Sequence, residues 1–235
     1  MQAVDTSSPS LARVYDHLLG GRANFAADRA LAARLQPLYP QMADVLAFSR
    51  TYTAARIAEL PPGGVCQFID VGCGLPTRPS VHEAALRARP DARVVCVDRD
   101  PAVVAHAAAL VPSALRPPAS VRVIEADLME PEALVWTLGP LLDLTRPACL
   151  VLALVVQALP DAGLARALTE VLIRALAPGS YVILTVPAGQ EARLPDAATG
   201  TGFGPADMES FLAGLDLLPP GVTAGPALCA TARKP

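Results

Sequence analysis

Five short apolar runs that alternate with alanine-rich stretches constrain the fold of this chain most strongly. The runs lie at residues 66–71, 93–98, 121–125, 148–155 and 181–186. Strands that are apolar along their whole length are buried on both faces, which is typical of a parallel sheet covered by helices. The stretches between them, at 81–89, 101–111, 131–141 and 163–177, have the length and composition of crossover helices. The pattern predicts βαβ units and therefore an α/β fold.

The segment before the first apolar run has a different pattern. Apolar residues recur at helical spacing at about 10–19, 26–35 and 42–60, and Pro61 to Gly64 then stop helix formation. We therefore expect an N-terminal helical segment over residues 1–62 and a sheet domain over residues 63–235. A polar, glycine-rich loop at 189–204, a helix at 207–215 and a closing strand at 227–232 complete the prediction.

Composition and charge argue against several classes of protein. The chain has 235 residues, of which 17% are charged, and its formal net charge of −3 gives no reason to expect nucleic acid or an anionic membrane as partner. The longest apolar run, Ala148 to Val156, is shorter than the roughly 18 residues of a membrane-spanning helix. No signal-peptide pattern is visible, and the five cysteines are scattered without a CxxC pair. We expect a cytoplasmic protein without a metal site.

The clearest functional motif follows the first strand. It reads DVGCG over residues 70–74, an acidic residue at the end of an apolar strand and two glycines at the turn into a helix. The glycines allow a tight turn and a close approach of the backbone to a ligand. A dinucleotide fingerprint would require a third glycine at position 77, where the chain has Thr77. This departure favours a ligand without a pyrophosphate and makes a nicotinamide-dependent oxidoreductase a weak alternative.

Two further acidic residues lie at the ends of the next two strands. Asp98 ends the second strand, and Asp127 follows the third. The carboxyl ends of parallel strands meet at the edge where open α/β sheets bind ligands, so we expect Asp70, Asp98 and Asp127 to lie together. An ionised carboxylate can accept hydrogen bonds from both hydroxyls of a ribose, which suits Asp98. Asp127 can accept from an adenine amino group, with Leu128 against the ring.

These motifs resemble those of class I S-adenosylmethionine-dependent methyltransferases over residues 64–186. A narrower resemblance covers nearly the whole chain and rests on RVYDHLLGG at 13–21, NFAADR at 24–29, GLPT at 74–77, VHE at 81–83 and VDRDP at 97–101. These strings are similar to the signatures of an actinobacterial S-adenosyl methyltransferase family, formerly a domain of unknown function. The resemblance implies a Rossmann-like class I methyltransferase fold with a mostly parallel seven-stranded sheet, helices on both faces and an N-terminal helical extension.

The resemblance also implies S-adenosylmethionine as the cofactor and assigns residues to it. Asp70, Gly72 and Gly74 would line the methionine end of the cofactor. Asp98 would contact the ribose and Asp127 the adenine. The predicted cofactor site is completed by Cys73, Thr77, His82, Arg99 and Leu128.

Methyl transfer requires mainly that a nucleophile is aligned with an already activated methyl group, and a general base only where the acceptor must lose a proton. His17 and Tyr15 are the candidate catalytic residues, on the expectation that the N-terminal segment folds over the site as a lid. His17 stands where the family usually has a tyrosine, and Gln157 where a histidine is common, which leaves the acceptor open. We expect His82 to position the glycine turn and His106 to be a surface or packing residue.

The expected function is methyl transfer to a small molecule, in secondary metabolism given the family's actinobacterial members. No Asn/Asp/Ser-Pro-Pro-aromatic motif follows the fourth strand, and aromatic residues make up 4% of the chain, which argues against nucleic-acid methylation and base stacking. Two alternatives remain open. One is non-methylating chemistry with the same cofactor, either a displacement that releases methylthioadenosine or a cyclisation. The other is a non-catalytic partner protein that binds the cofactor. As for assembly, a homodimer is the oligomeric state that we consider.

Overall fold

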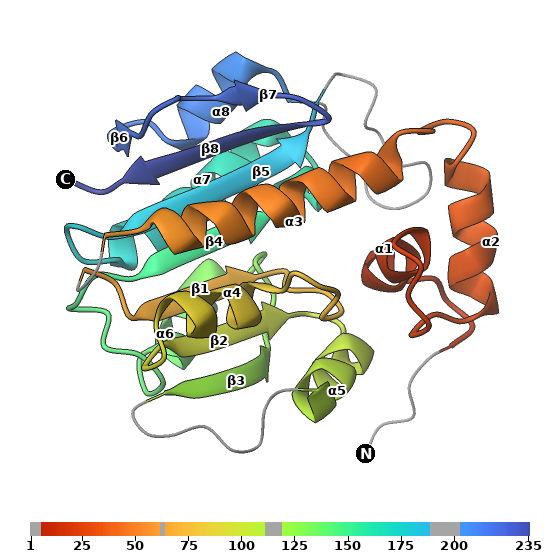
Figure 1. Cartoon of the computed structure of the whole chain (residues 1–235), viewed down its shortest axis with the longest axis horizontal. Helices are drawn as coiled ribbons and strands as arrows, with labels where there is room; N and C mark the ends of the chain where they lie inside the picture. Colours follow the sequence, from red (N-terminus) through yellow and green to blue (C-terminus); the bar gives the residue numbers. More distant parts are fainter. Residues whose placement is uncertain (1–5, 62–63, 111–118, 189–202) are drawn as a thin grey trace.

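One mixed sheet forms the centre of the computed structural model, which describes residues 6–61, 64–110, 119–188 and 203–235 (Figure 1). Its strands are β1 (Gln67–Val71), β2 (Arg93–Asp98), β3 (Ser120–Glu125), β4 (Cys149–Ala153), β5 (Tyr181–Pro187), β6 (Asp216–Leu217), β7 (Thr223–Ala224) and β8 (Ala227–Arg233). Their order is β3-β2-β1-β4-β5-β8-β6, and β7 also pairs with β8. Strands β1 to β5 are parallel, whereas β8 is antiparallel to β5.

The sheet confirms the predicted α/β class and corrects its details. The described residues form eight strands rather than seven, because β6 and β7 add short antiparallel pairings to β8. Strands of two residues are too short to show a hydrophobic period. Strand β4 ends at Ala153, two residues before the predicted end. There Leu154 adopts a φ of 54°, which turns the chain out of the strand, although its N–H still donates to the carbonyl of Thr185 on β5 at 3.0 Å.

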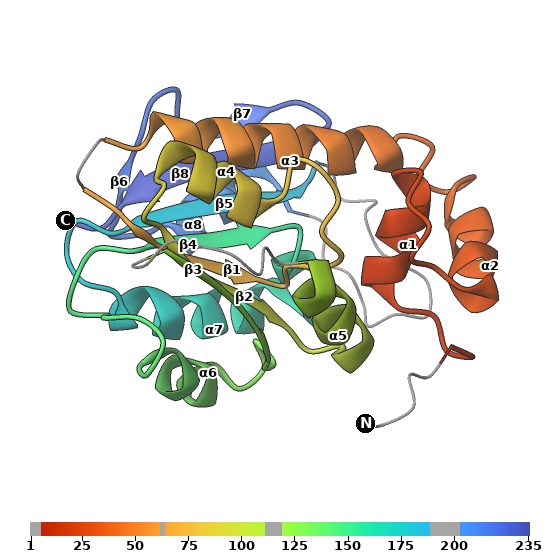
Figure 2. The same ribbon diagram turned by 60° about the horizontal axis from the view of Figure 1, so that its bottom comes forward.

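Helices cover both faces of the sheet, as predicted (Figure 2). The helices are α1 (Leu11–Leu18), α2 (Ala26–Leu35), α3 (Met42–Glu59), α4 (Val81–Ala88), α5 (Pro101–Leu110), α6 (Pro131–Leu138), α7 (Ala162–Ala175) and α8 (Pro205–Phe211), and a 3-10 turn, η1 (Val156–Ala158), follows β4. Helices α3 and α4 lie on one face, and α6 and α7 lie on the other. Neighbouring strand residues therefore enter different cores: Phe68 packs in the α3 and α4 core, and Ile69 in the α6 and α7 core.

The N-terminal helices occupy two places. Helix α3 runs along the sheet and packs against α4, β4, β5 and β8 (Figure 1). Two hydroxyl contacts fix it there, Ser49 Oγ to Thr185 Oγ1 at 2.6 Å and Tyr52 Oη to Thr231 Oγ1 at 3.1 Å. Helices α1 and α2 pack against each other at the carboxyl ends of the parallel strands, around a small core that includes Val14.

Local sequence explains where α4 begins. Ser80 Oγ accepts a hydrogen bond from the Glu83 N–H at 3.4 Å, and a carboxylate oxygen of Glu83 accepts one from the Ser80 N–H at 3.3 Å. This capping box holds the start of the helix close behind the glycine turn. Ser10 precedes α1, and its side chain makes no capping hydrogen bond among the described residues.

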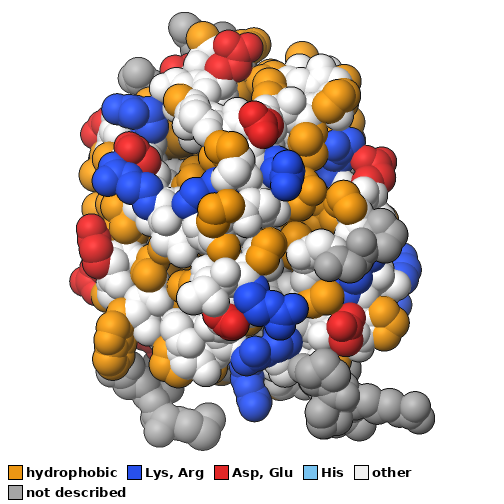
Figure 3. Space-filling view, turned by 90° about the vertical axis from the view of Figure 1, so that its left-hand side faces the viewer, with side chains coloured by type: hydrophobic (Ala, Val, Ile, Leu, Met, Phe, Trp, Pro, Cys, Tyr) orange, Lys and Arg blue, Asp and Glu red, His pale blue; other side chains and the backbone are white. Residues whose placement is uncertain are grey.

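The surface opposite α1 is mixed in character. Figure 3 shows the face at the amino-terminal ends of the parallel strands, where hydrophobic, basic and acidic side chains intermingle. None of the described helices has both the length and the apolar character that crossing a membrane requires. The predicted glycine-rich loop at 189–204 lies almost entirely outside the described residues.

Candidate active site

A cavity of about 570 Å³ lies at the carboxyl ends of β1 to β4, within the volume range typical of small-molecule sites. Its walls come from the turn after β1, the ends of β2 and β3, the segment after β4, and helices α1 and α3. Most of the predicted site residues line it: Tyr15, Asp70, Gly72, Cys73, Gly74, His82, Asp98, Arg99, Asp127 and Leu128. His17 and Thr77 are not among the lining residues.

The glycine turn forms one wall of the cavity, and its backbone requires glycine. Gly72 has a φ of 70° and Gly74 a φ of 61°, in the left-handed region that favours this residue. A Cβ atom on Gly72 would lie 2.4 Å from Cγ2 of Val155, which follows β4. The Gly74 N–H donates to Oδ2 of Asp98 at 2.9 Å. The turn is therefore packed closely against its neighbours and joined to the acidic residue at the end of β2.

Asp98 is held in one orientation by the backbone. It is 8% exposed, and its Oδ1 accepts from the Asp100 N–H at 3.0 Å while Oδ2 accepts from Gly74. Burial raises the pKa of Asp98, and the two backbone hydrogen bonds oppose that rise. Each carboxylate oxygen keeps a further lone pair for a ligand. This fits the predicted contact with a pair of ribose hydroxyls.

The end of β3 places an acidic and an apolar residue side by side. Asp127 Oδ1 accepts from the Met129 N–H at 2.9 Å, and its Oδ2 lies 3.8 Å from Nη1 of Arg99. Leu128 is buried. An acceptor beside an apolar side chain fits the edge and face of an adenine ring. The Arg99 side chain is 67% exposed, which places it at the rim of the cavity.

Asp70 is a buried carboxyl group in the wall of the cavity. It is 6% exposed, and among the described residues no group makes a hydrogen bond or ion pair with it. Burial raises its pKa well above the usual range; the charges of Cys96 and Asp98 add to the rise and Arg50 opposes it. A buried acidic group that lines a cavity suits a cationic ligand, because the ligand's charge would compensate its desolvation. Both the ammonium and the sulfonium of S-adenosylmethionine meet that requirement.

Arg50 is a cavity residue that the sequence analysis missed. It projects from α3, and its guanidinium donates to the carbonyls of Thr77 at 2.9 Å and Leu75 at 3.4 Å. The Thr77 carbonyl thus fixes Arg50, while the buried Thr77 hydroxyl has no hydrogen-bond partner in the described segments. Burial lowers the pKa of Arg50, and the charge of Asp70 opposes that change. Most arginines on helices are exposed to solvent, so nothing in the sequence indicated that Arg50 lines the cavity.

Two cysteines and a histidine lie together at the glycine turn, of which Cys73 is a part. Cys73 and Cys96 are free thiols that line the cavity with His82. The pKa of Cys96 is lowered because the Cys73 thiol and then His82 favour its ionised form. His82 is buried, with its Nε2 atom 3.5 Å from Oγ of Ser80.

The two predicted catalytic residues occupy different environments. Tyr15 reaches the cavity from α1, and burial raises the pKa of its phenol, opposed by the neighbouring amide of Gln157. His17, near the end of the same helix, is partly exposed and is not brought to the cavity. Residues two apart on a helix do not share a face, so one helix cannot direct both side chains inward.

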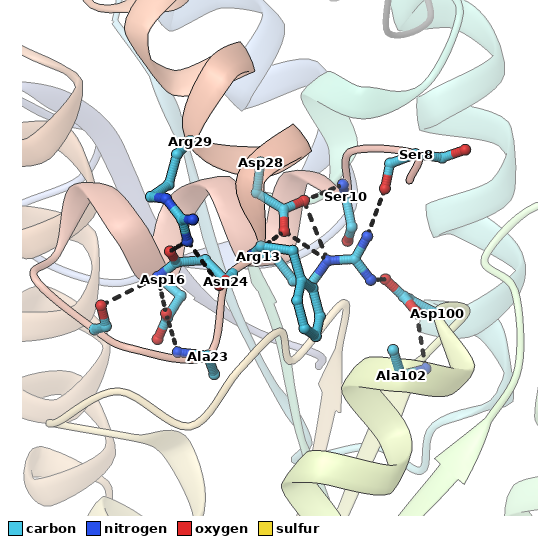
Figure 4. Close-up of polar contacts among 12 residues, drawn as sticks. Ser8, Ser10, Arg13, Asp16, Ala23, Asn24, Asp28, Arg29, Asp100 and Ala102 are labelled. Atoms are coloured by element: carbon cyan, nitrogen blue, oxygen red, sulfur yellow. Dashed lines mark hydrogen bonds and ion pairs between the residues drawn. The ribbon is translucent and has the colours of Figure 1, made fainter. Parts of the chain in front are cut away.

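A buried polar network joins α1 to the sheet (Figure 4). Asp28, which is 0% exposed, accepts from the N–H groups of Ser10 at 2.9 Å and Phe25 at 2.7 Å, and from Nε of Arg13 at 3.0 Å. Nη1 of Arg13 lies 3.6 Å from Oδ2 of Asp100, in the loop after β2. The N-terminal signature residues therefore hold α1 against the loop whose Asp100 N–H donates to the Asp98 carboxylate.

A second set of signature residues has a local structural role. Oδ2 of Asp16 accepts from the Ala23 N–H at 2.8 Å and from Nδ2 of Asn24 at 2.9 Å, and the Arg29 guanidinium donates to the Asn24 carbonyl at 3.1 Å (Figure 4). These contacts fold the link between α1 and α2.

We expect Asp70→Asn to stabilise the free protein and to weaken its binding of S-adenosylmethionine. Because the pKa of Asp70 is higher in the folded state than in the unfolded state, folding stability falls as pH rises from the ordinary carboxyl pKa to the raised one. The asparagine variant does not lose this stability. Its melting temperature should therefore exceed that of the wild type at pH values above the raised pKa of Asp70. Its affinity for the cofactor should fall about tenfold, or about 1.4 kcal/mol.

Thermal unfolding across pH and calorimetric titration measure the two effects of Asp70→Asn. Asp44→Asn, at an exposed position of α3, is the control and should change neither. A variant that melts below the wild type at every pH would contradict the account of Asp70 as a destabilising, ligand-directed group.

The fold and the cavity together define a class I S-adenosylmethionine-dependent methyltransferase. A family model described as S-adenosyl methyltransferase matches residues 1–227, and the chain belongs to this family. It is therefore a methyltransferase that uses S-adenosylmethionine, as the sequence resemblance predicted. A search of curated proteins found no match.

Several solved structures are similar to this chain. A DUF574 family protein from Streptomyces avermitilis is 29% identical, with a TM-score of 0.89, and the match covers 99% of this chain and 100% of that one. A proposed methyltransferase from Thermobifida fusca is 31% identical, with a TM-score of 0.88 over 98% of this chain and 96% of that one. The magnesium protoporphyrin IX methyltransferase of Synechocystis, solved with bound S-adenosylmethionine, is 15% identical with a TM-score of 0.60 over 100% of both chains, and shows the fold alone.

Proposed function

We propose that the protein transfers the methyl group of S-adenosylmethionine to a small-molecule acceptor within the cavity at the carboxyl ends of β1 to β4. The observation that carries the proposal is the convergence of Asp70, Asp98 and Asp127 on one cavity beside a glycine turn. The cavity volume of about 570 Å³ must hold the cofactor and the acceptor together, which favours a small acceptor.

The roles of the cofactor residues follow from their chemistry. Asp98 would accept hydrogen bonds from the ribose hydroxyls, and Asp127 with Leu128 would hold the adenine. Gly72 and Gly74 would let the backbone approach the methionine portion. When bound, the cofactor supplies an activated methyl group, so the protein's task is to orient the reactants and to exclude water.

The acceptor would lie between α1 and the segment after β4. Tyr15 lines the cavity from α1, and Val155, Ala158 and Leu159 line it from the segment after β4. Because burial raises the pKa of Tyr15, the phenol stays protonated and can donate a hydrogen bond. Tyr15 is therefore proposed to orient the acceptor rather than to remove its proton, and His17 is given no role in the reaction.

We also propose that α1 and α2 act as a lid over residues 63–235. Pro9 to Ala12 and Tyr15 contribute to the cavity wall, so a bound cofactor would contact this segment directly. The Arg13 to Asp100 contact would close the lid beside the ribose. A cytoplasmic location, the absence of nucleic-acid partners and a homodimer stay predictions.

Calorimetric titration with S-adenosylmethionine and S-adenosylhomocysteine tests the proposed site through Asp98→Ala. We expect the variant to bind both ligands at least tenfold more weakly than the wild type, a loss of about 1.4 kcal/mol. Asp44→Ala, on the exposed face of α3, should bind as the wild type does. Failure of the folded wild type to bind either ligand would overturn the proposal. Turnover products then separate the alternatives, since methyl transfer releases S-adenosylhomocysteine and displacement releases methylthioadenosine.

A further inference from the structure

We infer that Arg50 binds the carboxylate of the cofactor's methionine portion, while Asp70 faces its ammonium group, so that the two side chains recognise the amino-acid zwitterion. This inference rests on the proposed function, because it assigns one end of the same cofactor. Both residues line the cavity, Arg50 from α3 and Asp70 from the end of β1.

The position of Arg50 is fixed before any ligand binds. Its Nη1 and Nη2 atoms donate to the carbonyls of Thr77 and Leu75, which belong to the segment after the glycine turn. These two contacts use only some of the five N–H donors of a guanidinium. The remaining donors are held in a defined plane, as bidentate recognition of a carboxylate requires.

The charge of Arg50 is not balanced by an anion from the residues that the structure describes. Among the described residues, no carboxylate lies within ion-pair distance of its guanidinium, and the influence of Asp70 is longer-ranged. Burial of a cation is costly without an anionic partner, which is why the pKa of Arg50 is lowered. Arg99, the other arginine of the cavity lining, is mainly exposed and lies close to Asp127. Arg50 is therefore the guanidinium that a ligand carboxylate would compensate.

Thr53 provides an independent observation at the same wall. It lines the cavity one helical turn after Arg50, on the same face of α3. Thr53 is 2% exposed, and its buried hydroxyl has no hydrogen-bond partner within the described part of the chain. Buried polar groups are normally hydrogen-bonded, so an unsatisfied hydroxyl in a cavity wall points to a polar ligand atom. A carboxylate beside Arg50 would satisfy both side chains.

The test compares ligands that share the adenosine portion. Calorimetric titration would use S-adenosylmethionine, decarboxylated S-adenosylmethionine, which lacks only the carboxylate, and methylthioadenosine, a neutral thioether that lacks the whole amino-acid portion. We expect Arg50→Met to weaken S-adenosylmethionine binding at least tenfold and to leave binding of the other two ligands within twofold of the wild type. Arg87→Met, at an exposed position of α4, is the matched control and should preserve all three affinities.

Each outcome of the titration either supports or overturns the inference about Arg50. An equal loss for S-adenosylmethionine and the decarboxylated ligand would show that Arg50 only supports the glycine turn and would overturn the inference, as would no loss at all. If Arg50→Met does not fold, the comparison passes to Arg50→Lys, whose ammonium keeps the charge without the planar fork. The quantity to compare is the ratio of the affinities for S-adenosylmethionine and its decarboxylated form. A ratio in Arg50→Lys at least threefold lower than in the wild type would support the inference, and an unchanged ratio would overturn it. A wild type that binds none of the ligands would instead remove the proposed function.

Discussion

Asp28→Asn is expected to destabilise the packing of α1 and α2 by about 3 kcal/mol, because it removes one member of a buried ion pair. Asp28 is fully buried, and both of its oxygens accept hydrogen bonds, from Ser10 and Phe25 N–H groups and from Arg13. Asparagine has the same shape, but one of its two polar ends is an amino group. Whichever way the amide is turned, that amino group faces donors and leaves buried groups unsatisfied.

The loss should appear first as local opening, because the Asp28 network holds α1 and α2 to each other and to the loop after β2. Limited proteolysis should cleave residues 11–35 faster in Asp28→Asn than in the wild type, while the sheet stays folded. Addition of S-adenosylhomocysteine should slow cleavage of the wild type, since α1 lines the cavity. Asp44→Asn is again the control. Cleavage rates that the variant does not change would contradict the role given to the buried carboxylate.

Gly72→Ala is expected to lower the free energy of unfolding by about 3 kcal/mol and to abolish measurable cofactor binding. A positive φ costs a residue with a Cβ atom about 1 kcal/mol. The new methyl group would also lie 2.4 Å from Cγ2 and 2.8 Å from Cβ of Val155, and such overpacking costs roughly 1–3 kcal/mol more. Because Gly72 and Val155 both line the cavity, any shift that relieves the contact changes the shape of the site.

Two further variants separate the causes of the Gly72→Ala effect. Gly214 also has a positive φ, of 80°, but a Cβ atom there would meet nothing within 4 Å. Gly214→Ala should therefore lose only about 1 kcal/mol and should bind the cofactor normally. In the double variant with Val155→Ala the contact with Cγ2 is removed but the 2.8 Å contact with Cβ remains, so chemical denaturation should show part of the stability restored. Equal losses in Gly72→Ala and Gly214→Ala would disprove the steric explanation.

Sequence patterns predicted the framework because burial on two faces leaves a strong signal. Strands such as β2, in which nearly every residue is buried, read as continuous apolar runs and were located to within two residues. The acidic residues at the carboxyl ends of β1, β2 and β3 were found for a related reason. A parallel sheet brings the ends of its strands to one edge, so Asp70, Asp98 and Asp127 could be placed together without knowledge of side-chain geometry.

The other contributors to the cavity depend on long-range packing, which sequence periodicity does not encode. Arg50 enters the site only because α3 lies across the sheet beside the glycine turn. His17 was expected to face the site, but the direction of its side chain depends on how α1 rotates against α2. The role of Asp28 was likewise hidden, because its partners Ser10 and Arg13 lie 18 and 15 residues away in the chain.

Helix α3 also restricts how the length of the chain can vary. Ser49, Arg50 and Tyr52 contact β5, the segment after the glycine turn and β8 respectively, all within one turn of the helix. One inserted residue between them would rotate the later part of the helix by about 100° and turn Tyr52 away from its strand. Insertions and deletions among homologous sequences should therefore fall in the connections at the two ends of α3, and the helix itself should keep a constant number of residues between its contacts.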